Sequence, residues 1–152
     1  MKIIAHRANI NGSSSKNENQ TSSIKECIDL GYDVEIDIRL IDGILYLGHD
    51  KPQVVITIEE LKLIKNKIWL HCKNLEAFSF FRQINEEFNY FWHEEDSYTL
   101  TSKGYIWAFP GKELSPECIC VMPEINYSLD IIKDLRNLNI SGICTDYPNL
   151  LG

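Results

Sequence analysis

Short apolar segments alternate with amphipathic ones along most of the chain. Seven apolar segments favour β-strands, and they cover 2–7, 33–41, 67–73, 89–95, 104–109, 117–124 and 141–148. Four further segments repeat apolar residues at helical spacing, and they cover 21–31, 57–66, 74–88 and 128–139. Strands that alternate with helices indicate an α/β protein with a largely parallel sheet.

Local signals at the segment ends refine this pattern. Asp42-Gly43 separates 33–41 from a second apolar run at 44–48, which predicts an antiparallel hairpin. Thr57 and Glu60 have the spacing of a capping box and predict a helix start there. Asn74 and Ser128 precede the next two helical segments and are expected to be their N-caps.

The connections suggest a particular α/β architecture. The loops between 89 and 124 are only about ten residues long, which is too short for ordinary crossover helices. Seven to eight mainly parallel strands therefore predict a compact, helix-depleted (β/α) TIM-like barrel, although such barrels usually have about 200 residues or more. An open doubly wound sheet is the alternative. We expect one domain over 1–152.

Composition narrows the function. The chain has 152 residues, 44% of them hydrophobic, and a net charge of 15 − 22 = −7. An acidic chain argues against nucleic-acid binding and against electrostatic docking on an anionic membrane. We find no signal peptide and no apolar run of transmembrane length. The five cysteines contain no CxxC pair, which favours a reducing, cytoplasmic compartment.

Several predicted strands end in polar residues, and in α/β barrels the carboxyl ends of the strands carry the active site. Glu35 and Asp37 lie two residues apart, so they share one face of their strand. Two close carboxylates repel each other, and a divalent cation would relieve this, with an ion pair to Arg39 or Lys73 as the competing explanation. On the strand 67–73, His71 is placed to reach such a cation, and Lys73 a phosphate.

Two histidines accompany this carboxylate pair. His6 and His49 each follow a predicted strand, and imidazole suits both general acid and general base roles near neutral pH. Arg7 is suited to bind a phosphate oxygen. The candidates for substrate binding are Trp92, Trp107, Glu94 and Glu124, although wall packing also explains the two tryptophans.

These motifs, in this order, resemble the glycerophosphodiester phosphodiesterase family of phospholipase-C-like TIM-barrel enzymes. The resemblance rests on HR at 6–7, ENQTSSI at 18–24, the G-x-D-x-E-x-D pattern at 31–37, DG at 42–43, HD at 49–50 and the closing GICTDYP at 142–148. It is specific over residues 3–52, fair at 67–73 and 141–148, and faint between them.

The resemblance implies a role for individual residues. His6 and His49 correspond to the catalytic pair, Arg7 and Lys73 to phosphate-binding residues, and Glu35 and Asp37 to ligands of Mg²⁺ or Ca²⁺. Glu18 corresponds to a further metal ligand or to a support for the site. The implied reaction is hydrolysis of a glycerophosphodiester-like or sugar phosphodiester. A lyase that forms a cyclic phosphate and a non-catalytic module that binds a phospho-ligand are the alternatives.

The chain departs from the family pattern at three points. Ala8 replaces the glycine of the H-R-G motif, which matters if the backbone there needs a positive φ. His71 replaces the glutamate of E-x-K, so the metal site becomes mixed and tolerates Mn²⁺ or Zn²⁺ better. The chain is also short for the family, and absent helices would leave apolar sheet surface for a homodimer to cover.

Overall fold

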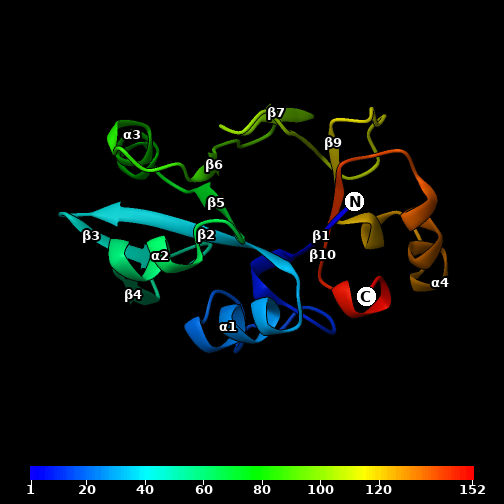
Figure 1. The fold of residues 1–152 in the computed structure, drawn as a ribbon, viewed down its shortest axis with the longest axis horizontal. Coiled ribbons are helices and arrows are strands. Elements are labelled where there is room, and N and C mark those ends of the chain that lie inside the picture. The colour runs from blue at the N-terminus through cyan, green and yellow to red at the C-terminus, as the bar shows by residue number, and fades with distance from the viewer.

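The computed structural model describes residues 1–152 as one curled sheet with helices around its outside (Figure 1). The strands are β1 (Lys2–Ala5), β2 (Asp33–Ile41), β3 (Ile44–Leu47), β4 (Val54–Ile56), β5 (Ile68–Cys72), β6 (Asn89–Phe91), β7 (Tyr98–Leu100), β8 (Ile106–Ala108), β9 (Cys118–Val121) and β10 (Gly142–Thr145). The α-helices are α1 (Thr21–Asp29), α2 (Ile58–Ile64), α3 (Leu75–Gln83) and α4 (Leu129–Ile132).

Seven of the strands run parallel, in the order β6-β5-β2-β1-β10-β9-β8. These are the seven strands that the sequence predicts. The order is that of a TIM-like barrel, but the barrel is not closed, because β6 and β8 are not paired. The antiparallel strand β7 lies on the free edge of β8. Only isolated hydrogen bonds join β7 and the turn that follows it to the region of β6, among them one from the amide of Ser102, just after β7, to the carbonyl of Tyr90 (2.9 Å).

The interior of this open barrel is filled by large apolar side chains. Trp69, Phe91 and Trp107 project inward, with ring centroids 4.6 Å apart for Phe91 and Trp107 and 5.9 Å apart for the two tryptophans. Ile4 and Ile119 complete this layer. Their packing closes the inside of the sheet where an eighth parallel strand is missing.

The other face of the sheet packs against the helices. Val34, Ile36 and Ile38 of β2 are fully buried in a cluster that also contains Phe81 of α3 and Leu61 of α2. A smaller cluster under α4 contains Cys120, Ile132, Leu135, Ile143 and Leu151. The alternation along β2 thus separates an apolar outer face from the face that carries Glu35 and Asp37.

The β2–β3 hairpin follows its sequence signal. Asp42 and Gly43 both have positive φ values (50° and 77°), which suits the tight turn that an Asp-Gly pair favours. Beyond it, β4 pairs antiparallel with β3. The short strands β4 and β7, of three residues each, were not predicted from the sequence.

The helices are shorter than predicted. Thr57 forms the expected capping box with Glu60, and the Asn74 side chain accepts a hydrogen bond from the amide of Ala77. The third helix ends at Gln83, however, and α4 covers one turn before the chain tightens into a 3₁₀ turn at Lys133–Asn137. Ser128 stands at the predicted N-cap position of α4, but its side chain makes no capping hydrogen bond.

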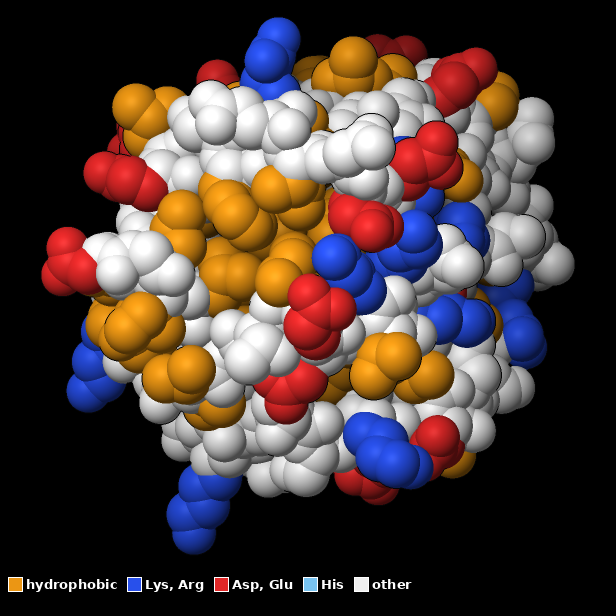
Figure 2. All heavy atoms as spheres, turned by 60° about the vertical axis from the view of Figure 1, so that its left-hand side comes forward, with side chains coloured by type: hydrophobic (Ala, Val, Ile, Leu, Met, Phe, Trp, Pro, Cys, Tyr) orange, Lys and Arg blue, Asp and Glu red, His pale blue; other side chains and the backbone are white.

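The surface carries charges of both signs. Figure 2 shows Lys and Arg side chains next to Asp and Glu side chains on one face, beside a hollow lined with apolar side chains. None of the helices combines the length and the apolar character that a membrane span requires.

Candidate active site

A cleft of about 240 Å³ opens at the carboxyl ends of the parallel strands. All four histidines of the chain line it. Its polar lining consists of His6, Arg7, Glu35, His49, His71, His93 and Asp96. A larger cavity of about 470 Å³ lies beside β7 and β8, but Glu113 is its only charged lining residue. The chemistry of the side chains therefore marks the smaller cleft as the candidate site.

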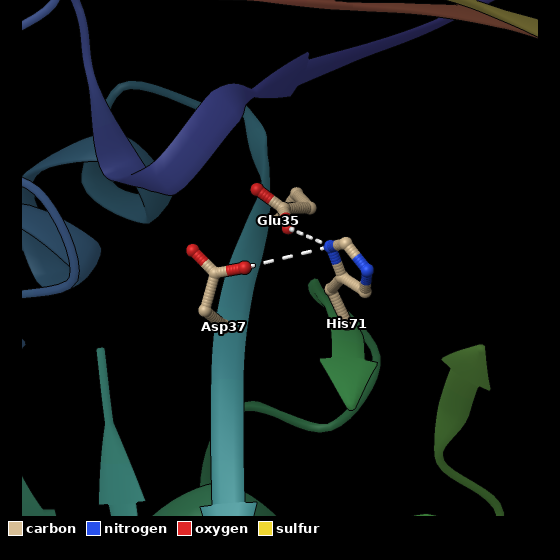
Figure 3. Close-up of side chains that lie close together, drawn as sticks. All are labelled: Glu35, Asp37 and His71. Atoms are coloured by element: carbon tan, nitrogen blue, oxygen red, sulfur yellow. Dashed lines mark ion pairs between the residues drawn. The ribbon is translucent and has the colours of Figure 1, made fainter. Parts of the chain in front are cut away.

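Glu35, Asp37 and His71 form the centre of this site. β2 and β5 are paired so that Asp37 lies opposite His71, and Figure 3 shows both carboxylates turned toward the imidazole. His71 Nδ1 is 3.5 Å from Glu35 Oε1 and 3.4 Å from Asp37 Oδ1. Single ligand atoms from the three side chains all lie within 4.8 Å of one another.

The two carboxyl groups of this centre have pKa values that are shifted in opposite directions. Burial raises the pKa of Glu35, but the hydrogen bond from His71 and the charges of His6 and His71 outweigh it and bring the pKa down to about 2. Burial and the neighbouring Glu35 carboxylate raise the pKa of Asp37. Two buried carboxylates with opposite shifts share one site, as expected when like charges are placed close together.

Asp37 is held in place on one side only. The Asn19 side chain donates to Asp37 Oδ2 (2.9 Å) and accepts from the Asp37 amide (2.9 Å). Asp37 Oδ1, on the side of His71, is buried without a hydrogen-bond partner, and so is His71 Nε2. A buried carboxylate oxygen without a partner is costly, and a bound cation would satisfy it. Glu35, Asp37 and His71 therefore fit a divalent metal ion.

His6 is oriented by residues from the last strand. Its Nδ1 donates to Asp146 Oδ1 (2.8 Å), to which the Asn9 amide also donates (2.8 Å). This leaves His6 Nε2 on the side of Glu35, 4.0 Å from Oε2. Burial alone would lower the pKa of His6, but the hydrogen bond to Asp146 and the charge of Glu35 raise it above its ordinary value.

His49 stands on the loop that follows β3. Its Nδ1 donates to Asp50 Oδ1 (2.7 Å), and the Arg39 guanidinium binds the carbonyl groups of Gly48 and His49. Gly48 has φ 147°, and a Cβ there would lie 2.0 Å from the carbonyl oxygen of Lys51. Only glycine fits this turn, so Gly48 fixes how His49 is presented to the cleft.

The predicted phosphate-binding residues differ in their placement. Arg7 lines the cleft, with Nη1 3.5 Å from Glu18 Oε2 and Nε 3.5 Å from Asp37 Oδ2. Glu18 also accepts hydrogen bonds from Asn9 and Ser13, so it supports Arg7 and stands outside the group around His71. Lys73 is half-buried just after β5 and is not among the lining residues.

Of the predicted substrate-binding residues, only Trp107 lines the cleft. Trp92 packs near Phe78 of α3 on the outer face of the sheet (6.0 Å), and Glu94 is exposed. Both alternate with His93, which faces the cleft. Glu124 accepts hydrogen bonds from Thr145 Oγ1 (2.9 Å) and from the Asp146 amide (2.7 Å), so it braces the strand end that holds His6.

Sequence reasoning missed several residues of the site. His93 lies in the cleft and stacks on His71 at 4.7 Å, and burial together with His71 lowers its pKa. Its position two residues beyond the inward-facing Phe91 was a usable signal. Asn19 acts through Asp37 and Asp146 acts through His6, and nothing in their local sequence pattern indicated those contacts.

The backbone at the H-R-A motif departs from ordinary geometry. Arg7 and Ala8 both adopt positive φ values (50° and 63°), where a glycine would be free of strain. The amide of Arg7 uses this turn to donate to Glu35 Oε2 (3.0 Å). Ala8 therefore adopts this turn at an energetic cost.

Fold and site together define an open TIM-like barrel with an acid–imidazole centre and three further histidines in the cleft at the carboxyl ends of its strands. Two solved structures share this fold. One is a glycerophosphodiester phosphodiesterase from Agrobacterium tumefaciens str. C58, with a TM-score of 0.61 and 14% identity over 99% of this chain and 98% of the other. The other is a putative glycerophosphodiester phosphodiesterase from Galdieria sulphuraria, with a TM-score of 0.53 and 14% identity over 97% and 94% of the two chains.

No family model and no curated protein sequence matches the chain. At 14% identity the structural likeness establishes the fold. It confirms the resemblance to glycerophosphodiester phosphodiesterases at the level of fold. The roles of individual residues remain predictions.

Proposed function

We propose that the protein is a divalent-metal-dependent phosphodiesterase that hydrolyses a small glycerophosphodiester-like or sugar phosphodiester. The observation that carries this proposal is the unpartnered Asp37 Oδ1 beside Glu35 and His71, flanked by His6 and His49 in one cleft. Phosphoryl chemistry needs this combination of a charge-neutralising centre and two proton-transfer groups.

The residues of the cleft divide the work as follows. Glu35, Asp37 and His71 would hold the metal ion, which when bound neutralises negative charge on the phosphate oxygens. Arg7 contributes a fixed positive charge at the same place. His6, with its raised pKa, stays protonated further into the neutral range and is suited to protonate the leaving alcohol. His49 is then the base that deprotonates the attacking water.

Assay of a generic phosphodiester tests this proposal. We expect turnover by the wild type with Mg²⁺, Ca²⁺ or Mn²⁺, and loss of at least about 10²-fold in His6→Ala and His49→Ala. Glu76→Gln on α3, outside the cleft, serves as the control and should retain full activity. Absence of metal-dependent turnover by the wild type would exclude the enzyme and leave a phospho-ligand-binding module. Phosphorus NMR of the product separates a hydrolase from a lyase, because a cyclic ester differs in shift from an open monoester.

We further propose that His71 changes the choice of metal. An imidazole beside two carboxylates favours Mn²⁺ or Zn²⁺ more than an all-oxygen site does. Calorimetric titration of the wild type and His71→Glu with Mn²⁺ and Ca²⁺ tests this, and the variant should shift the preference toward Ca²⁺. Asp134→Asn, remote from the cleft, is the control. If neither metal binds, His71 itself neutralises the two carboxylates.

The assembly and compartment are also proposals. The groove beside β7 and β8 exposes Tyr98 and Leu100 and also contains Ile106 and Leu114. No helix covers it, and we propose that a second copy of the chain does. A monodisperse monomer in light scattering at high concentration would refute the dimer. All five cysteines are free and buried, which is in keeping with a cytoplasmic location.

A further inference from the structure

The cleft has two chemically different walls. The polar wall comes from β1, β2, β5 and the loops after β3 and β6, whereas the opposite wall comes from β8, β9 and the residues that follow them. Apart from Trp107, the second wall consists of Phe109, Pro110, Val121, Met122 and Ile125. None of these five side chains has a nitrogen or oxygen atom.

This apolar wall is exposed at its outer end. Ile125 is 65% exposed and Phe109 48% exposed, although large apolar side chains are usually covered when they lie together. Deeper in the cleft, Trp107 and Val121 are buried. The wall therefore runs as a continuous apolar strip from the interior of the barrel to its rim.

The backbone holds the strip in shape. Gly111 has φ 76°, and its Cβ position would be 3.0 Å from the side-chain amide of Asn126, so the two loops are in contact. The amide of Ile125 donates to the carbonyl of Met122 (3.1 Å), and Met122 itself adopts a left-handed φ of 48°. The loop after β8 and the 3₁₀ turn after β9 thus form one surface.

Apart from the indole N–H of Trp107 at its inner end, the side chains of the strip offer no partners for hydroxyl groups. The charged residue nearest to it in sequence, Glu124, is occupied by Thr145 and by the Asp146 amide. A sugar or glycerol placed on the strip would lose hydrogen bonds to water without replacement, which costs free energy. An alkyl chain would gain from the same contact.

From the structure we infer that the substrate is amphiphilic. The geometry points to a phosphodiester with a polar alcohol on the histidine side and an alkyl- or acyl-bearing alcohol on the strip. At about 240 Å³ the cleft is smaller than the usual range for whole ligands, roughly 300–1,000 Å³. The phosphate and the first methylenes are enclosed, and the rest of the chain extends past Phe109 and Ile125. The hydrolysis of such a substrate rests on the proposed function, whereas its binding in the cleft does not.

Binding is tested without turnover. Calorimetry compares methylphosphonate with octylphosphonate, both below any micelle concentration, in the presence of Mn²⁺. We expect octylphosphonate to bind at least about tenfold more tightly, because each fully covered methylene is worth roughly fourfold. Ile125→Ser and Phe109→Ser should remove most of this preference. Leu63→Ser, an exposed leucine on α2, is the matched control and should keep it.

Catalysis is tested with glycerol phosphodiesters whose second alcohol is a straight chain of one to ten carbons. We expect kcat/KM to rise with chain length in the wild type and in Leu63→Ser, and to stay flat in Ile125→Ser. Equal binding of the two phosphonates, or a preference that survives both serine variants, would overturn the inference. A preference in binding without hydrolysis of any diester would overturn the hydrolase proposal and leave the amphiphile site standing.

Discussion

Alanine at Gly48 incurs two costs, a backbone conformational penalty and a steric clash of its Cβ, and comparison with Gly43→Ala helps to distinguish them. Both Gly48 and Gly43 have positive φ values, but a Cβ at Gly43 meets nothing within 4 Å, whereas at Gly48 it would lie 2.0 Å from the Lys51 carbonyl oxygen. In the left-handed region the conformational penalty alone is about 1–2 kcal/mol for alanine, and Gly48 at φ 147° lies further from the conformations of alanine than Gly43 at φ 77°. The difference between the two variants therefore measures the additional backbone and steric cost at Gly48.

The size of that effect follows from the contact. Real Cβ atoms do not approach other atoms closer than 3.0 Å, so the loop must move by about 1 Å to accept alanine. His49 stands on this loop, and a misplacement of about 1 Å at a reacting group costs on the order of 10²-fold in rate. We expect Gly48→Ala to be less stable than Gly43→Ala by at least about 1 kcal/mol and to lose about 10²-fold in turnover.

Thermal unfolding and a phosphodiester assay on the two variants provide the measurement. For a domain of this size, about 1 kcal/mol lowers the Tm by roughly 2–4 °C. Equal Tm values together with full turnover by Gly48→Ala would refute the argument that this glycine positions His49.

Three further predictions concern the centre and the core. Asp146→Asn removes the charge and weakens the hydrogen bond that raise the pKa of His6 while burial continues to lower it, so an NMR titration should show a lower pKa, and an unchanged value would refute the orienting role. The pKa of Glu35 in the folded state is depressed to about 2 from an ordinary 4.5. The ionised Glu35 therefore stabilises the fold above pH 4.5, and this contribution is lost as the pH falls toward 2. In pH-dependent unfolding, Glu35→Gln should reduce the loss of stability over this acidic range. Phe81→Ala, at 1% exposure in the outer core, should cost about 3–5 kcal/mol in chemical denaturation, and a cost below about 1 kcal/mol would mean that α3 contributes little to the fold.

The parallel strands could be predicted because their signal is local. The alternation of apolar residues along 33–41 and the short apolar run within 67–73 indicate strands regardless of their partners. The antiparallel strand β7 could not be found this way, because its three residues, Tyr98–Leu100, are fixed by pairing with β8 and not by their own pattern. The failure of the barrel to close has the same cause, since closure depends on pairing between distant strands.

The residues of the site also divide into those that the local sequence indicated and those that only the pairing of distant strands brings together. Glu35 and Asp37 could be identified from their spacing on one strand, and His6 and His49 from their positions at strand ends. Trp92 and Glu94 were proposed from their residue types and their shared parity, and the alternation that continues beyond β6 turns them away from the cleft. Asp146 lies 140 residues from His6, and only the parallel pairing of β1 with β10 brings the two together.

The gap between β6 and β7 is the place where the barrel is not closed by a strand ladder. The polar wall of the cleft ends at β6 and the apolar wall ends at β8. The two walls face each other across this gap, and a continuous strand ladder joins them only on the opposite side of the barrel, through β1, β10 and β9. Elements held by few hydrogen bonds open first, and amide exchange should therefore begin at Tyr98 and Leu100. Opening there would separate the two walls of the cleft without unpairing a parallel strand.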